Sequence, residues 1–359
     1  MTLSYQNLLL VLSFAVSFLV AFAATPLAKV IAHKIGAIDV PKDERRVHKQ
    51  PIPRLGGLAI FYGFIVSVLS FIEFDTGVKG ILLGALVIVL LGIIDDVYQL
   101  KARLKLVIQI AAALIVAFYG VKIEFLTNPN IFSSQPTIPL GYFALPVTVM
   151  WIVGITNAVN LIDGLDGLAA GISSIASISL LFISLLASES SVAILTAALA
   201  GSCLGFLPYN FNPAKIFMGD TGATFLGFIL ATVSIQGLFK GYAVITFAVP
   251  LLILGLPIFD TGYAILRRLL SGKSIMEADR GHLHHRLIDM GFSQKQTVMI
   301  LYTISGILGL SAVVLAGSGA LSAMILILSV LVFVVAGAKY MYTPISELAK
   351  SGDNESTQE

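Results

Sequence analysis

Long apolar runs constrain this chain more than any other feature of its sequence. Runs of about 17 or more apolar residues recur along most of the 359-residue chain, and each can cross the ~30 Å hydrocarbon core of a bilayer as a helix. Inside hydrocarbon, only a helix or a closed barrel satisfies its own backbone hydrogen bonds. Charged residues make up 12% of the sequence, whereas soluble domains carry about 25%. The sequence therefore predicts an all-α polytopic membrane protein.

The apolar runs predict roughly ten to eleven transmembrane helices in one integral membrane domain. We interpret the first run, 8–27, as a span and not as a signal peptide, because no basic segment precedes it and no small-residue cleavage site follows it. The domain is expected to occupy residues 1–340, with a polar cytoplasmic tail over 341–359. The predicted spans lie at about 5–28, 55–73, 78–94, 104–119, 142–157, 168–187, 191–208, 222–238, 242–266, 297–316 and 319–340.

Basic residues divide unevenly between the two membrane sides that these spans define. Of the 22 Lys and Arg residues, only 3 fall on one side, namely Lys79, Lys122 and Lys240. The positive-inside rule makes the opposite side, with 19, cytoplasmic and places the N-terminus outside. The stretch 121–139 is then the one sizeable outer loop, and its Pro and Thr content predicts short strands or irregular structure.

Four polar side chains at a spacing of three residues mark the stretch 157–168. On a helix of 3.6 residues per turn this spacing drifts by about 60° per step, so the four cannot share one narrow face. We expect the first two to end one helix, Gly164 and Gly167 to turn the chain, and Asp166 to cap the next helix. A plain polar turn with an Asp cap is the alternative. The four residues are Asn157, Asn160, Asp163 and Asp166.

An acidic pair, Asp95-Asp96, ends the third predicted span. Acids at a helix C-terminus oppose the helix dipole, and adjacent acids repel each other. The pair therefore needs a cation, a shared proton or basic partners. The bases Lys101, Arg103 and Lys105 follow closely, so they pair with the acids or bind phosphate, and a solvated acidic turn is the alternative.

Two further polar segments border predicted spans on the same side. Arg54 lies between Pro53 and a Gly-Gly pair at the entrance of a span, where backbone can approach a ligand closely. In the segment 210–222, Asp220 is expected to cap a helix that begins at Thr221. The free N–H groups of that helix and Lys215 suit a phosphate, while Asp220 suits a hard cation such as magnesium. For Phe217, stacking on a base and anchoring in the bilayer both remain open.

Three of the five histidines fall within four residues, at His282, His284 and His285. The single Cys203 excludes an intramolecular disulfide and a cysteine zinc site. Zinc bound by the histidines alone and a plain surface loop are alternatives. Because Arg280 and an arginine at position 286 flank the histidines, phosphate contact is favoured.

The ninth predicted span carries an acid, Asp260, which is interpreted as either functional or structural, since acids inside a membrane are costly. The same span contains Pro250, Gly255 and Pro257, so the helix is expected to bend or break there.

Acids at three span ends, surrounded by Lys, Arg and His, predict a magnesium-dependent phosphoryl-transfer site at the inner membrane surface. That location implies one lipid substrate and one water-soluble substrate. A transporter with a polar cytoplasmic gate is a rival, although it would place its acids near the bilayer midplane. A CDP-alcohol phosphotransferase would carry Ala-Arg after its first acid, whereas Gly164-Leu165 follows Asp163 here. A purely structural membrane protein would not need these acids.

These motifs resemble the polyprenyl-phosphate N-acetylhexosamine-1-phosphate transferases, and the resemblance covers about residues 5–340. Each motif is weak alone, but five in this order on one membrane side are specific. The segments that carry it are Pro53-Arg54-Leu-Gly-Gly, Asp95-Asp96, 157–168, Phe217-Met-Gly-Asp220 and His282-Leu-His284-His285.

The resemblance implies a role for each group of polar residues. Asp220 would be the ligand of Mg²⁺, or of Mn²⁺ in its place, and Asp95 or Asp96 would deprotonate or orient the lipid phosphate. The uridine nucleotide would face Asn160, Asp163, Asp166, Asn210 and Phe217, and the histidines would face the pyrophosphate. Catalytic candidates are Asp95, Asp96, Asp163, Asp166, His282, His284 and His285. Substrate-binding candidates are Arg54, Lys101, Lys105, Asn157, Asn160, Asn210, Lys215, Phe217 and Arg280.

The form of the histidine segment suggests the branch within the family. A His-x-His-His segment is usual in the bacterial N-acetylglucosamine-1-phosphate branch, whereas the muramoyl-pentapeptide branch tends to carry three consecutive histidines. The resemblance thus implies UDP-N-acetylglucosamine as donor and undecaprenyl phosphate as acceptor, in the plasma membrane of a bacterium. The product would start a cell-wall or surface polymer such as lipopolysaccharide or teichoic acid. A phospho-N-acetylmuramoyl-pentapeptide transferase is the alternative. Nucleic acid is not an expected partner, and a homodimer is left open.

Overall fold

The computed structural model describes residues 2–41, 50–128, 137–238, 248–272 and 281–318, together with 322 and 328. This part of the chain is almost entirely helical. Its two sheets are short antiparallel hairpins, one joining β1 (Ile38–Asp39) to β2 (Ile52–Pro53) and one joining β3 (Phe125–Thr127) to β4 (Thr137–Pro139). The helices are α1 Thr2–Ile35, α2 Gly57–Phe71, α3 Thr76–Tyr98, α4 Ala102–Phe118, α5 Ala144–Ile162, α6 Leu168–Leu186, α7 Ser190–Asn210, α8 Gly219–Leu238, α9 Ala248–Ile253, α10 Gly255–Leu270, α11 Leu283–Asp289 and α12 Gln294–Ser318, with a 3-10 turn at Gly141–Phe143.

Six of the described helices are long and apolar enough to cross a membrane, namely α1, α3, α5, α6, α7 and α12. The prediction of a helical polytopic membrane protein is therefore confirmed. The first eight predicted ranges and the tenth each overlap a helix, and the described part of the ninth, from 248 on, is helix broken at Leu254 between α9 and α10, as its Pro and Gly residues predict. The short strands expected in the outer loop are β3 and β4. The predicted range 319–340 and the tail 341–359 lie outside the described residues.

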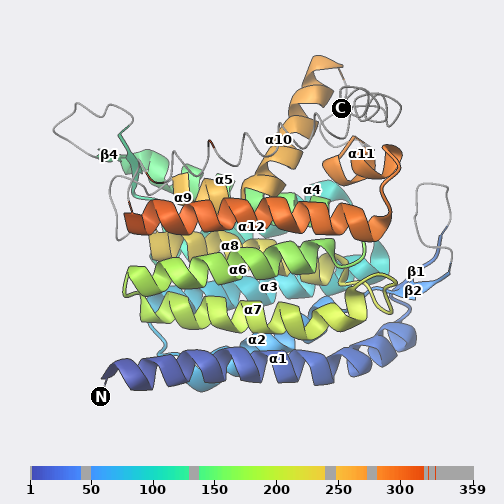
Figure 1. Ribbon diagram of the computed structural model, residues 1–359, viewed down its shortest axis with the longest axis horizontal. Coiled ribbons are helices and arrows are strands. Elements are labelled where there is room, and N and C mark those ends of the chain that lie inside the picture. Colours follow the sequence, from blue (N-terminus) through green and yellow to red (C-terminus); the bar gives the residue numbers. More distant parts are fainter. Residues whose placement is uncertain are drawn as a thin grey trace, which may run out of the picture.

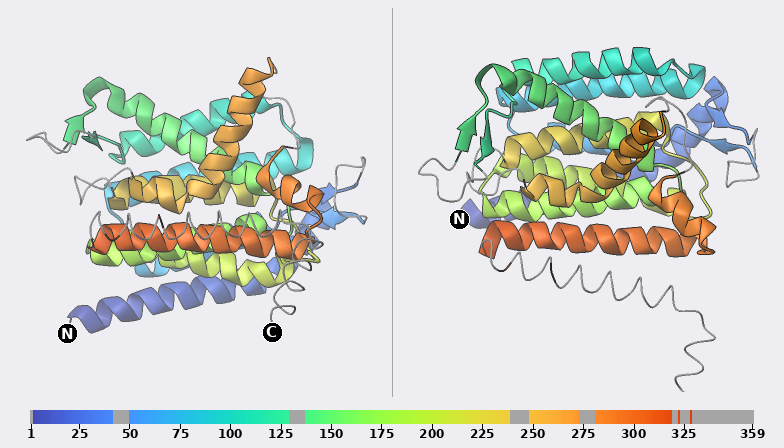
Figure 2. Two further views of the ribbon diagram at one scale, coloured as in Figure 1. Left: turned by 45° about the horizontal axis from the view of Figure 1, so that its top comes forward. Right: turned by 90° about the horizontal axis from the view of Figure 1, so that it is seen from above.

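The long helices lie side by side with their axes roughly aligned (Figure 1). The start of α1 and the β3–β4 hairpin lie at one end of the bundle, and β1, β2 and α11 lie at the other. Among the longer helices that the structure describes, α10 departs most clearly from this direction and projects out of the bundle, as the two further views also show (Figure 2). The bundle thus has two distinct ends, and the polar motifs gather at the end of β1, β2 and α11.

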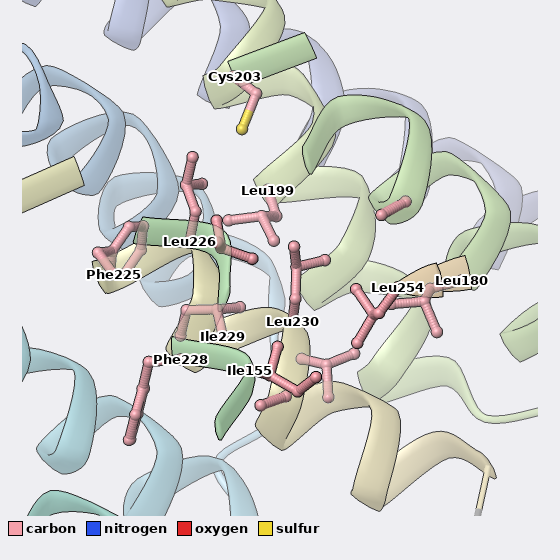
Figure 3. Packing of buried hydrophobic residues seen from close by; sticks show 14 of the residues in the cluster. Ile155, Leu180, Leu199, Cys203, Phe225, Leu226, Phe228, Ile229, Leu230 and Leu254 are labelled. Atoms are coloured by element: carbon pink, nitrogen blue, oxygen red, sulfur yellow. The ribbon is translucent and has the colours of Figure 1, made fainter. Parts of the chain in front are cut away.

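Helix α8 forms the centre of the bundle. It packs against α2, α3, α5 and α6, and Phe225, Phe228 and Ile229 are fully buried. These side chains meet Ile155 of α5 and Leu199 of α7 in a continuous apolar cluster (Figure 3). A helix that is apolar all round belongs in the interior of a bundle, so α8 is the element against which the others are arranged.

The first turn of α8 lies in close contact with two neighbouring helices. A side chain at Gly57 of α2 would collide with the backbone of Gly222, and one at Gly92 of α3 would collide with the backbone of Thr221. Glycine alone permits this approach, because it has no Cβ. The start of α8, with Asp220 in its first turn, is thereby held between α2 and α3.

Candidate active site

A cavity of about 340 Å³ opens at this end of the bundle, where α3 and α5 end and α8 begins. It brings together residues that are far apart in the sequence. The predicted site residues that line it are Arg54, Asp96, Asn160, Asp163, Asp166, Asn210, Phe217, Asp220 and His285.

Asp96 holds the start of α8. Its carboxylate accepts hydrogen bonds from the backbone N–H groups of Asp220 (2.9 Å) and Thr221 (3.0 Å) and from the Thr221 hydroxyl (2.6 Å). The side chain is 3% exposed. The expectation that Asp220 caps this helix is therefore wrong: the helix begins one residue earlier, at Gly219, and the capping carboxylate comes from α3. This arrangement leaves the Asp220 carboxylate to face the cavity.

Lys105 joins two of the acids across the site. Its Nζ lies 2.8 Å from Oδ2 of Asp95 and 2.7 Å from Oδ2 of Asp220. The other oxygen of Asp220 accepts from Nδ2 of Asn160 at 3.2 Å, and the other oxygen of Asp95 accepts from the Leu100 N–H at 2.6 Å. The predicted pairing of the acidic pair with a following base is thus confirmed for Lys105, whose single positive charge is shared between one acid at the end of α3 and one at the start of α8.

Arg54 and Phe217 lie on two segments that pair along their backbones. The Phe217 N–H donates to Pro53 O at 2.8 Å, and the Gly56 N–H donates to Phe217 O at 2.9 Å. The Arg54 guanidinium donates to the backbone carbonyl of Asp96 through Nε (3.1 Å) and Nη2 (2.8 Å). Since the last carbonyls of a helix lack intrahelical partners, Arg54 satisfies one at the end of α3 and is fixed at the cavity wall.

Asp166 is held by the segment after α7 and not by α6. Its Oδ2 accepts from Nδ2 of Asn212 and from the Ala214 N–H, each at 2.9 Å. The N-cap of α6 is Gly167, with a φ of +79°, so the expectation that Asp166 caps this helix is wrong. The glycine turn is as predicted, and the two asparagines lie in the last two turns of α5, which ends at Ile162.

Asp163 stands at the end of α5 among other acids. Burial, followed by the negative charges of Asp220 and Asp96, raises the pKa of its carboxyl to about 8. Five acids line the cavity, whereas Arg54 is the one Lys or Arg among its lining residues, and this excess of acids favours a bound cation.

The histidines differ in their surroundings. His285 lines the cavity, whereas His282 and His284 are 5% and 3% exposed. Burial, and then the charge of His285, lowers the pKa of His284 to about 3, so this ring is neutral. His282 Nδ1 lies 2.8 Å from Oδ2 of Asp260, and the Leu283 N–H donates to Oδ1 of that acid at 2.7 Å. These contacts join Asp260 to the histidine segment through both of its carboxylate oxygens.

Seven predicted residues in the described part of the chain are not among those that line this cavity: His282 and His284, Lys105, which contacts the lining residue Asp220, and four more. Asn157 donates to Oε1 of Gln109 on α4 at 2.7 Å. Lys101 is exposed just before α4, and Lys215 is exposed beside a second cavity of about 550 Å³. Asp95 is buried behind Lys105. Arg280 lies outside the described residues.

Two polar side chains that line the cavity were not predicted. Asp39 comes from β1, and Gln294 begins α12. Gln294 Oε1 accepts from Asn212 Nδ2 at 2.7 Å, and Asn212 also holds Asp166. Neither residue belongs to a motif, and only the folded chain brings them beside residues 160–166.

A cavity lined by acids, Arg, His and an aromatic side chain, at one end of an apolar helical bundle, defines an integral membrane enzyme. Comparison with known proteins identifies its class. The family model described as Glycosyl transferase family 4 matches residues 78–238. The chain belongs to this family, and the resemblance to polyprenyl-phosphate N-acetylhexosamine-1-phosphate transferases is confirmed.

Three relatives place the chain in the bacterial branch. It is 43% identical over 307 residues to a probable undecaprenyl-phosphate N-acetylglucosaminyl 1-phosphate transferase of Bacillus subtilis, with 85% of each chain covered. It is 35% identical over 323 residues to a decaprenyl-phosphate N-acetylglucosaminephosphotransferase of Mycobacterium tuberculosis, covering 82% of this chain and 79% of the relative. It is 32% identical over 303 residues to an undecaprenyl-phosphate α-N-acetylglucosaminyl 1-phosphate transferase of Thermotoga maritima, covering 82% and 88%.

The capping of α8 by Asp96 makes a testable prediction. Thr221→Val keeps the shape of a fully buried side chain but removes the hydroxyl that donates to the Asp96 carboxylate. Because hydrogen bonds to charged groups contribute about 1.5–3 kcal/mol, we expect a loss of stability of this order. Thermal unfolding in detergent measures it, with Thr221→Ser, which keeps the hydroxyl, as the matched control. Equal melting temperatures for the two variants would contradict the capping role.

Proposed function

We propose that this protein transfers N-acetylglucosamine 1-phosphate from UDP-N-acetylglucosamine to undecaprenyl phosphate. An oxygen of the lipid phosphate forms a bond to the sugar-linked phosphorus, the bond from that phosphorus to the bridging oxygen breaks, and UMP leaves with the electron pair. The observation that carries the proposal is the single cavity that gathers Asp220, Asp163, Asn160 and Phe217 at one end of an apolar bundle. The names of the relatives, which specify this sugar phosphate and a polyprenyl acceptor, support it.

The donor set of the cavity fits a magnesium ion. Carboxylate oxygens are the ligands that this hard cation prefers, and it is usually held by one or two carboxylates together with substrate phosphates. Asp220, and Asp163 beside it, would hold the ion. When bound, magnesium would neutralise phosphate oxygens and stabilise the charge that develops during phosphoryl transfer.

The other residues have separate tasks in this scheme. Lys105, held between Asp95 and Asp220, supplies a positive charge at the acidic end of α3, where the lipid phosphate would be oriented. His285, which lines the same cavity, would contact the pyrophosphate of the donor. Phe217 would stack on the uracil ring. Since phosphoryl transfer is catalysed mostly by positioning and charge stabilisation, such fixed contacts account for the rate.

The His-x-His-His form of residues 282–285 favours N-acetylglucosamine over the muramoyl-pentapeptide sugar. We also propose that the chain crosses the membrane ten to eleven times and that the cavity faces the cytoplasm. The division of basic residues supports the orientation.

The assay of the proposed reaction is direct. Purified protein is incubated with undecaprenyl phosphate and magnesium, with UDP-N-acetylglucosamine and UDP-N-acetylmuramoyl-pentapeptide at equal concentration. We expect release of UMP and a lipid product that carries N-acetylglucosamine. Predominant transfer of the pentapeptide sugar would overturn the branch but keep the reaction type, and absence of UMP with either donor would overturn the function.

The role of Asp220 is tested by Asp220→Asn, which keeps the shape of the side chain and removes the charge that a hard cation needs. We expect turnover to fall by orders of magnitude and the magnesium-induced rise in melting temperature to disappear. Asp289→Asn, at an exposed acid on α11, is the control and should behave as the unaltered protein. Turnover of Asp220→Asn within a few-fold of the control would exclude Asp220 as the metal ligand.

The orientation is tested by cysteine labelling in intact cells. Ser271 is exposed at the end of α10, so Ser271→Cys in a Cys203→Ala background places one reactive thiol on the side assigned to the cytoplasm. We expect a membrane-impermeant maleimide to label this thiol only after the cells are opened. Lys122→Cys, on the opposite predicted side, is the positive control. Labelling of position 271 from outside would reverse the topology.

A further inference from the structure

We propose that Asp260 is a positioning residue of the active site: from α10 it fixes the His282 imidazole and the start of α11, and so sets the place of His285 in the cavity. This inference rests on the proposed function, in which His285 contacts the donor. It assigns a task to an acid that lies outside the cavity and that the proposed reaction does not otherwise use.

Both oxygens of Asp260 bind the histidine segment. Oδ2 accepts from His282 Nδ1 at 2.8 Å and Oδ1 accepts from the Leu283 N–H at 2.7 Å. Asp260 and His282 are 4% and 5% exposed. Because a carboxylate only accepts, the Nδ1 of His282 must carry a proton, and the ring is fixed in both orientation and tautomer.

Two further side chains on the same face of α10 hold the same segment. Tyr263 and Arg267 follow Asp260 by three and seven residues, a spacing that lines them up along one side of a helix. Arg267 donates to Gly281 O at 2.8 Å, and Arg286 donates to the Tyr263 hydroxyl at 3.1 Å while stacking over its ring. One stripe of α10 therefore holds residues 281–286 from end to end.

Helix α11 depends on these contacts for its position. It has 7 residues, which is too few for a helix to be stable by itself in water. Its own N-cap residue, His282, makes no side-chain capping bond, and the cap is supplied by Asp260. On its other side, His284 lies against Gly164, where a side chain would collide with the imidazole.

These contacts connect α10, through the histidine rings, to the turn that carries two acids of the cavity. Asp260 holds His282, the His282 and His284 rings are stacked at 5.8 Å, and His284 packs against the turn between Asp163 and Asp166. His285, the ring that lines the cavity, is next to His284 in sequence and 4.3 Å from it between ring centroids. A displacement of the His282 ring is thus transmitted to His285, and misplacement by about 1 Å can cost about 100-fold in rate.

The test compares Asp260→Asn, Asp260→Glu, His282→Gln and the double variant Asp260→Asn/His282→Gln in the UMP-release assay, with each protein first shown to be folded by its melting temperature.

We expect Asp260→Asn to lower kcat about 10- to 100-fold, with the KM for UDP-N-acetylglucosamine changed by less than about threefold. Asp260→Glu should recover part of the loss. The double variant should be no worse than the poorer single variant, because both changes break one bond. Asp289→Asn, on the exposed end of α11, is the matched control.

Each other outcome overturns the proposal. It fails if folded Asp260→Asn keeps kcat within about twofold of the control, if the loss appears only in KM, or if the two single losses multiply in the double variant. If Asp260→Asn does not fold, His282→Gln tests the same bond from the other side, and an unchanged kcat there is equally contrary. An unaltered protein that releases no UMP would overturn the proposed function instead, so the two failures are distinguishable.

Discussion

The hydrogen bonds between the Asp96 carboxylate and the first turn of α8 are the interaction on which the rest of the site depends. A helix that begins inside a bundle has N–H groups without partners, and leaving them unpaired away from water costs free energy. Asp96 satisfies two of them and the Thr221 hydroxyl as well. Because α8 is buried on all sides, fixing its first turn against α3 also fixes the position of Asp220 relative to α2, α3 and α5.

This cap explains why two adjacent acids at one helix end are tolerated. Asp96 interacts with the partial positive charge of the α8 N-terminus, whereas Asp95 faces Lys105. The two carboxylates thus have different partners and different tasks, although they are neighbours in sequence. Five acids line the cavity and only one Lys or Arg, Arg54, is among its lining residues, while burial and then the charges of Asp220 and Asp96 raise the pKa of Asp163. A site with such an excess of acids favours a divalent cation, together with a substrate whose phosphate oxygens bind the same cation.

The histidine segment, residues 281–286, is held in place by other contacts than the acids are. It lies on a helix too short to hold itself, and it receives its geometry from the side chains of α10 and from the turn at Gly164. The break at Leu254 lets α10 leave the direction of the bundle and reach this segment (Figure 2). The acids and the histidines are therefore supported by separate parts of the fold, one by the packed centre around α8 and the other by α10.

The sequence by itself determined the class of fold and most of the site. Apolar length decides membrane helices, since hydrocarbon forces the backbone into helix, and the breaks at Pro and Gly follow from local sterics. Polar residues between apolar runs must lie at span ends, so Arg54, Asp163, Asp220 and the histidines were found without coordinates. The partners of the acids were not found in this way. Asp96 caps α8 in place of Asp220, Asp166 binds Asn212, and Asp260 binds His282. The residues in each of these contacts are 22 to 125 positions apart in the sequence. Periodicity and local propensity report only on near neighbours along the chain. Which donor meets which carboxylate is decided by how the helices pack, and only the tertiary structure contains that information.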